Sequence, residues 1–78
     1  MPKYSLTSAW SDAIPVEAGD YVQNQSADPV EICAISPANS SDAIKLPPFE
    51  AVIISEAISI RARSSGNWPG DIVVAGGL

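Results

Sequence analysis

Histidine is absent from this 78-residue chain, and cysteine occurs once, at Cys33. A single cysteine cannot form an intrachain disulfide, and without histidine it cannot contribute to a zinc site of the usual Cys/His kind. The commonest general base and triad member is missing too. We therefore expect no catalytic residues, no cofactor and no metal ligands, and we interpret Cys33 as a small apolar filler on a strand.

Basic residues are also scarce. Four Lys and Arg stand against nine Asp and Glu, which gives a formal net charge of −5. Binding to nucleic acid needs a basic surface that neutralises phosphates, so this composition argues against a nucleic-acid partner. The charge suits a solvated surface or a basic protein partner.

Long apolar segments are missing as well. Unbroken apolar runs such as Ala51–Ile54 and Ile72–Ala75 contain four residues, whereas a membrane-spanning helix needs roughly 20. Residues 1–12 contain one lysine and no apolar stretch of the kind found in secretion signals. We expect no membrane association and no secretion signal.

Proline disfavours helices along most of the chain. Seven prolines leave one gap of 20 residues, Phe49–Trp68, and that gap is rich in β-branched residues. Alternation of apolar and polar residues indicates strands at Asp20–Gln25, Val30–Ile35, Ala43–Leu46, Ala51–Ser55, Ala57–Ser64 and Asp71–Ala75. The sequence predicts an all-β fold, a small antiparallel β-sandwich or barrel of six to seven short strands.

Turn residues predict how these strands connect. The SADP segment, Ser26–Pro29, favours a tight turn, so the strands on either side of it should pair as a hairpin. The EAGD segment, Glu17–Asp20, is a second turn. The longest loop, residues 36–42, is either the tip of the molecule or a crossing between sheets.

Residues 1–78 are expected to form one β domain, in which residues 1–9 and 76–78 are flexible or arm-like. The expected core consists of Val22, Val30, Ile32, Ala34, Leu46, Val52, Ile54, Ile58, Ile60, Ile72 and Val74. In so small a domain, hydrophobic burial and lost chain entropy nearly cancel. Self-association is the remaining means of stabilisation, because the sequence offers neither a disulfide nor a metal site.

Two pairs of residues are candidates for a contact with a subunit or another partner. Arg61 and Arg63 project from one face of a strand, and arginine is enriched at contacts between proteins. They either meet carboxylates of another subunit or lie in solvent and balance carboxylates across the strand. Trp10 and Trp68 lie in or beside loops, where they either mark a protein or sugar contact or cap the ends of the core.

Several segments resemble small structural proteins of tailed bacteriophages. They are a tryptophan near residue 10, VEAGDYVQNQSADPVEIC, IKLPPFEAVIIS, ISIRARSSG and the closing GDIVVAG. In those β-domains a strand with an Asn-containing tract precedes a Pro-Val-x-Ile segment, and a strand with a Val-Arg-Ala motif precedes the last strand. The resemblance extends from about Trp10 to Ala75 and departs from the pattern at PPFE, where a proline–glycine turn is more usual.

The resemblance implies a non-enzymatic virion protein, most specifically a capsid decoration (cement) protein or a head or tail fibre subunit, assembled in the host cytoplasm. The expected partners are further copies of the chain, in a homotrimer, and a larger virion protein such as the major capsid protein. Two alternatives remain open. One is a receptor- or carbohydrate-binding module of a fibre or tail tip that uses Trp10 and Trp68 as stacking platforms. The other is a host-encoded interaction domain without a viral role.

Overall fold

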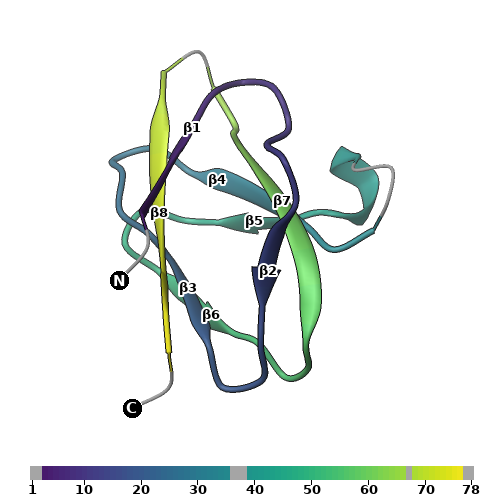
Figure 1. The fold of residues 1–78 in the computed structure, drawn as a ribbon. Helices are drawn as coiled ribbons and strands as arrows, with labels where there is room; N and C mark the ends of the chain where they lie inside the picture. Colours follow the sequence, from purple (N-terminus) through teal and green to yellow (C-terminus); the bar gives the residue numbers. More distant parts are fainter. Residues whose placement is uncertain (1–2, 36–38, 67, 77–78) are drawn as a thin grey trace.

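The computed structural model describes residues 3–35, 39–66 and 68–76 (Figure 1). These residues form eight strands and one short 3-10 helix. The elements are β1 (Lys3–Leu6), β2 (Ile14–Val16), β3 (Tyr21–Asn24), β4 (Val30–Cys33), η1 (Ser40–Asp42), β5 (Ile44–Leu46), β6 (Ala51–Ile53), β7 (Ile58–Ser64) and β8 (Gly70–Ala75). The predicted all-β fold is confirmed, with eight strands in place of the six to seven expected.

The strands form two four-stranded antiparallel sheets that pack face to face. Sheet A has the order β1-β8-β3-β6, and sheet B has the order β2-β7-β4-β5. The chain passes from one sheet to the other at every connection except the one between β4 and β5. The edges of the sandwich are therefore β1 and β6 in sheet A and β2 and β5 in sheet B.

The predicted hairpin across Ser26–Pro29 is wrong. β3 pairs with β6 and β8, whereas β4 pairs with β5 and β7. The segment between β3 and β4 therefore crosses between the sheets, although its residue types are those of a tight turn. The loop at residues 36–42 joins two neighbours in sheet B and so is not a crossing; its residues 36–38 lie outside the described residues.

A buried asparagine fixes the path of the crossing. Asn24, at the end of β3, donates from Nδ2 to the backbone carbonyls of Asp28 (2.8 Å) and Leu46 (3.1 Å). Its Oδ1 accepts from the backbone N–H (2.9 Å) and the hydroxyl (2.5 Å) of Ser26. Leu46 belongs to sheet B, so one side chain joins the two sheets and satisfies polar groups of a segment that has no strand partner.

The predicted EAGD turn is present, and it joins β3 to β2, a strand that the sequence patterns do not predict. Gly19 has φ 91°, a conformation that glycine adopts without steric cost. The Asp20 N–H donates to the Glu17 carbonyl at 3.0 Å. The Ile54 N–H donates to the Asp20 carbonyl at 2.8 Å, which ties the end of β6 to the start of β3.

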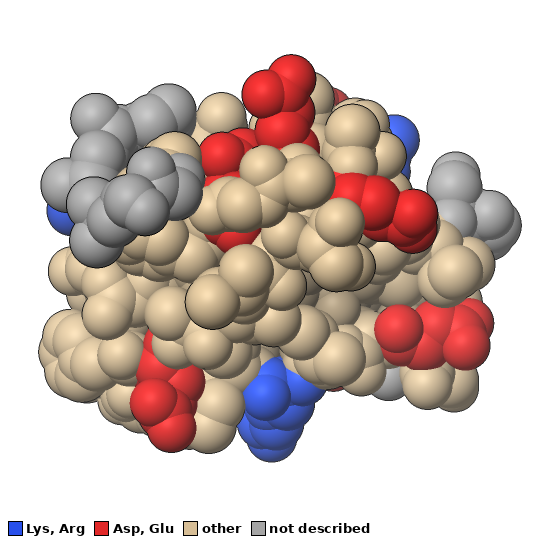
Figure 2. All heavy atoms as spheres, turned by 90° about the horizontal axis from the view of Figure 1, so that it is seen from below, with Lys and Arg blue, Asp and Glu red and all other residues tan. Residues whose placement is uncertain are grey.

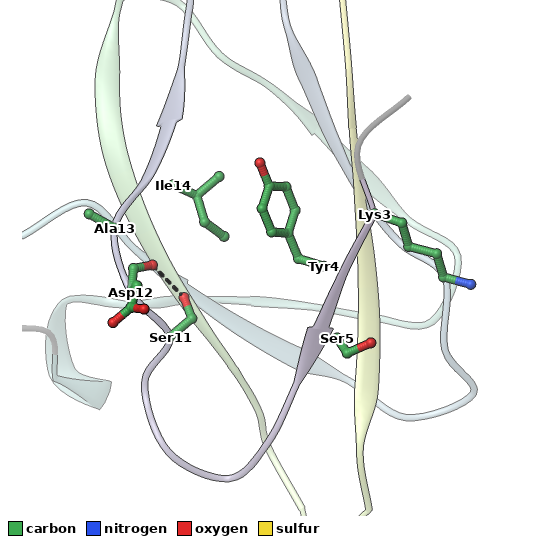
Figure 3. Close-up of a pocket in the computed structure, with 7 residues that line it drawn as sticks. All are labelled: Lys3, Tyr4, Ser5, Ser11, Asp12, Ala13 and Ile14. Atoms are coloured by element: carbon green, nitrogen blue, oxygen red, sulfur yellow. Dashed lines mark hydrogen bonds between the residues drawn. The ribbon is translucent and has the colours of Figure 1, made fainter.

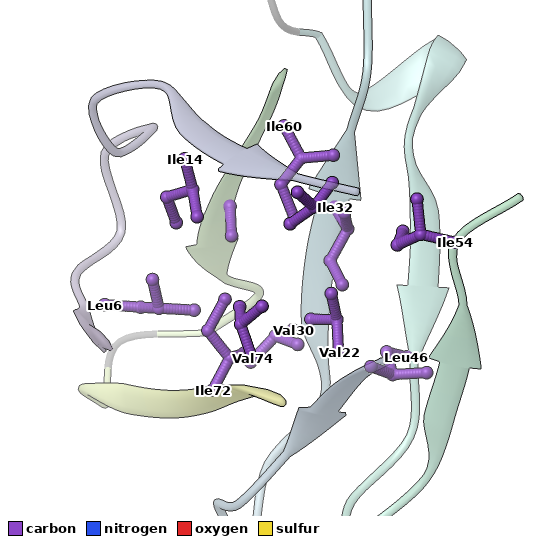
Figure 4. Close-up of a cluster of buried hydrophobic side chains, with 12 residues drawn as sticks. Leu6, Ile14, Val22, Val30, Ile32, Leu46, Ile54, Ile60, Ile72 and Val74 are labelled. Carbon is purple, nitrogen blue, oxygen red and sulfur yellow. The ribbon is translucent and has the colours of Figure 1, made fainter. Parts of the chain in front are cut away.

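The core lies between the two sheets (Figure 4). One cluster contains Leu6, Ile14, Val16, Val22, Val30, Ile32, Leu46, Ile54, Ile60, Ala62, Ile72 and Val74. Three predicted core residues differ from expectation. Val52 and Ile58 are partly buried and pack against the cluster, and Ala34 is exposed because it follows the end of β4. Cys33 is buried, in agreement with its interpretation as an apolar filler.

Sequence patterns do not predict two of the strands, both near the N-terminus. Within residues 1–9, expected to be flexible or arm-like, Lys3–Leu6 form an edge strand that pairs with β8. β2 pairs with β7. Leu6, Ile14 and Val16 are each at most 3% exposed, so these strands supply part of the core.

Candidate interaction surface

Arg63 forms an ion pair within the chain. It lies on β7 directly opposite Glu31 of β4, and its Nε donates to Glu31 Oε1 at 2.8 Å. The two side chains are 27% and 16% exposed, so the pair is partly shielded from water and contributes more than an exposed pair does. This geometry corresponds to the alternative in which a carboxylate across the strand balances the arginine.

The connection between β1 and β2 packs along β7 beside this pair. The guanidinium carbon of Arg63 lies 4.6 Å from the centroid of the Trp10 ring, a cation–π distance. Arg61 donates from Nη1 to the Ser11 carbonyl at 3.1 Å. The Ser11 N–H in turn donates to the Ala62 carbonyl at 2.9 Å. The contacts of Arg61 and Arg63 therefore hold this connection against sheet B.

The four predicted site residues thus divide into two groups. Arg61, Arg63 and Trp10 come together on β7 and the adjoining connection, whereas Trp68 is 69% exposed in the connection between β7 and β8. Neither tryptophan belongs to the buried core cluster. The interpretation in which each tryptophan caps one end of the core is therefore not supported.

Replacing Arg63 with Glu is expected to lower the free energy of unfolding by roughly 1–3 kcal/mol, because it sets two carboxylates opposite each other and removes the cation–π contact. Urea denaturation followed by circular dichroism measures this loss. Lys45→Glu is the matched control, since Lys45 also lies opposite Glu31 but is exposed; its cost should stay well under 1 kcal/mol. Equal losses in the two variants would contradict a stabilising role for the contacts of Arg63.

Large apolar side chains are exposed at places that sequence reasoning did not single out. The exposed fraction is 53% at Ile35, 49% at Ile44, 60% at Phe49 and 75% at Ile53. The last three lie on β5, β6 and the turn between them, a segment (Ile44–Ile53) that we call the β5–β6 corner. The sequence does carry a signal for Ile53, because a strand with four consecutive apolar residues must place every second one on its outer face.

Phe49 is also strained in its backbone. Its φ is 62°, in the left-handed region that disfavours residues with a Cβ. The Glu50 N–H donates to the Pro47 carbonyl at 3.2 Å and closes a four-residue turn with Phe49 at its third position. Glycine would occupy this position without strain. An exposed aromatic residue at a strained position supports a role in binding.

Replacing Phe49 with Gly is expected to raise the free energy of unfolding by about 1 kcal/mol, since relief of the strain outweighs the larger entropy of glycine in the unfolded chain. Thermal denaturation measures the change. Phe49→Ala removes the ring but keeps the strain, and so it should give no gain. If both variants have the same stability, the backbone at residue 49 is not strained.

Hollows open beside the edge strands. An apolar one of about 160 Å³ is lined by Ile32, Ala34, Asp42, Ile44, Val52, Ile54, Ile58 and Ile60. A larger one of about 470 Å³ is lined by Lys3, Tyr4, Ser5, Ser11, Asp12, Ala13 and Ile14 (Figure 3). In Figure 3 the Tyr4 ring lies between β1 and Ile14, while Lys3 extends away from the hollow. Within its lining, the Ser11 hydroxyl donates to the Asp12 backbone carbonyl at 2.9 Å.

The part of the chain that the structure describes contains neither a candidate group of metal ligands nor a helix that could cross a membrane. In Figure 2 carboxylates lie at several separate positions around a largely uncharged surface, with few cations among them. Within residues 3–35, 39–66 and 68–76, no group of three or more His, Cys, Asp or Glu could hold a metal ion. No helix in the described part of the chain is long and apolar enough to cross a membrane.

Comparison of the chain with protein-family models, with curated proteins and with solved structures finds no match. The features that need an explanation are the exposed apolar residues of the β5–β6 corner and the exposed Trp68.

Proposed function

We propose that the protein is a non-enzymatic assembly subunit of a tailed-bacteriophage particle, most specifically a capsid decoration protein. The observation that carries the proposal is the exposure of Ile44, Phe49 and Ile53 at the β5–β6 corner of an otherwise acidic molecule. Covering these side chains with a partner protein is favourable, because it removes apolar surface from water. That the assembly is a tailed-phage particle is inferred from the segments that resemble structural proteins of tailed phages.

The small size of the domain supports the same proposal. Its lone cysteine is free and buried, so no disulfide within the chain constrains the unfolded state. A partner that binds only the folded chain stabilises it by mass action. The partners are further copies of the chain and a larger virion protein such as the major capsid protein.

Quantitative mass spectrometry of purified phage particles from the native source tests the proposal. The protein should be present at a fixed ratio to the major capsid protein, and the ratio should survive density-gradient purification. A protein found only in the unassembled fraction of the lysate would overturn the proposal.

A second candidate is a receptor- or carbohydrate-binding module, and the exposure of Trp68 favours it. Of the two stacking platforms considered, Trp10 already packs against Arg63, so Trp68 is the platform that presents its ring to solvent. Under this alternative, Trp68→Ala abolishes binding to host-cell glycans or receptors. Under the decoration proposal, the same variant enters particles normally and wild type shows no glycan binding.

A further inference from the structure

The four edge strands of the sandwich are not equally protected against pairing with another chain. β1 carries Lys3, β2 has Pro15 at its centre, and β5 carries Lys45. Lysine and proline are usual means of blocking an exposed edge. β6, Ala51–Ile53, has neither residue, and Ile53 is 75% exposed.

The backbone of β6 also has groups available for a further strand. Glu50 accepts from the Asn24 N–H at 3.0 Å, and Ile54 donates to Asp20 at 2.8 Å, so residues 50 and 54 face β3. Backbone groups alternate along an antiparallel strand. The N–H and C=O groups of Ala51 and Ile53 therefore point to the side of β6 on which the described residues place no strand.

We propose that β6 pairs antiparallel with β6 of a second copy of this chain, across a two-fold axis at Val52. In this register Ala51 of each copy lies opposite Ile53 of the other, and each pair exchanges two backbone hydrogen bonds. The small side chain of Ala51 leaves room for the large one of Ile53. The same edge is thus complementary to itself.

Charge favours this edge over the rest of the surface. Two copies that each carry a net charge of −5 repel each other in general, but β6 is uncharged. The nearest preceding carboxylate, Glu50, lies opposite Ile54 of the other copy. The two Glu50 residues are then four positions apart, about 13 Å along the strand, which exceeds the screening length at physiological salt.

The size of the contact predicts its strength. A three-residue edge buries far less than the roughly 800 Å² per partner of a standard complex. The pairing is therefore weak in dilute solution and depends on concentration. It becomes effective where other contacts, such as those on a particle, hold two copies close together.

The β6 pairing is one contact within the assembly that we propose, and its biological role rests on that proposed function. The pairing itself can be tested with the purified chain alone. The β6 contact is two-fold symmetric and joins two copies of the chain. It differs from the predicted homotrimer, in which Arg61 and Arg63 lie at or beside the contact.

Sedimentation equilibrium on the wild type, Ile53→Lys and Ser5→Lys tests the pairing. Ser5 is exposed on β1, at the opposite edge of the same sheet, so Ser5→Lys adds the same charge away from the contact. The wild type and Ser5→Lys should show the same reversible monomer–dimer equilibrium up to millimolar concentration. Ile53→Lys should raise the dissociation constant by at least about tenfold. Amide NMR signals of Ala51 and Ile53 should shift with concentration in the wild type.

Three results would overturn the pairing: a wild type that stays monomeric up to millimolar concentration, a wild type that forms trimers, or equal losses in the two lysine variants. If Ile53→Lys does not fold, Ile53→Thr replaces it, since threonine keeps the strand but removes apolar contact area. A chain that dimerises through β6 but is absent from particles would refute the proposed function and leave the pairing intact.

Discussion

Replacing Asn24 with Leu is expected to lower the free energy of unfolding by roughly 3–6 kcal/mol, enough to unfold much of a small domain. Leucine is close to asparagine in size but can make none of its hydrogen bonds, although the Asp28 carbonyl keeps the Ser26 hydroxyl as a donor at 3.1 Å. The carbonyls of Asp28 and Leu46 lose a donor, and Ser26 loses an acceptor. Each buried group that loses its partner costs about 1–3 kcal/mol. Urea denaturation of wild type and variant measures the loss.

Two further variants show whether the loss comes from these hydrogen bonds. Gln25→Leu makes the same kind of change at the next, exposed residue and should cost well under 1 kcal/mol. Asn24→Asp keeps the acceptor for Ser26 but points a carboxylate oxygen at two carbonyls, so its loss should also be large and should shrink when the carboxyl is protonated. An Asn24→Leu variant as stable as Gln25→Leu would contradict the role of Asn24.

Replacing Ile60 with Ala is expected to cost about 2–5 kcal/mol, the usual range for a buried aliphatic side chain. Ile60 is 1% exposed at the centre of β7 and also lines the apolar hollow of about 160 Å³. The lost volume therefore adds to an existing space. Thermal denaturation measures the effect. Ile53→Ala is the control, because Ile53 is 75% exposed; a larger loss in the control than in Ile60→Ala would mean that the inner and outer faces are assigned the wrong way round.

Strand patterning was predictable where apolar and polar residues alternate between recognisable turn residues. In β3 and β7, alternate residues such as Val22 and Ile60 are buried, as the sequence indicates. β1 was missed because it lies next to the N-terminus, where chains are usually poorly ordered unless a strand ties them down. β2 was missed because a proline at its centre argues against a strand unless the strand is known to be an edge.

The path of the chain between strands was less predictable. Ser26–Pro29 has the residue types of a tight turn whether it closes a hairpin or crosses between sheets. What decides the outcome is the hydrogen bond from Asn24 to Leu46, a residue 22 positions away. Local sequence does not contain that contact.

The candidate surface was predicted in part. The sequence singles out Arg61 and Arg63 but not their acceptors, because Glu31 and Ser11 become neighbours only when β4 and the β1–β2 connection pack beside β7. The exposed β6 edge could have been recognised from the apolar run Ala51–Ile54. The strain at Phe49 follows from the same turn that departs from the usual proline–glycine pattern.

The most direct test of the proposed assembly function is cosedimentation of the purified protein with phage particles that lack it. The wild type should bind to saturation at a fixed number of copies per capsid subunit, and Ile53→Lys should reach saturation only at higher concentration. An unrelated acidic protein of similar size sets the background. Binding of the wild type that never saturates, or that does not exceed this background, would contradict the account.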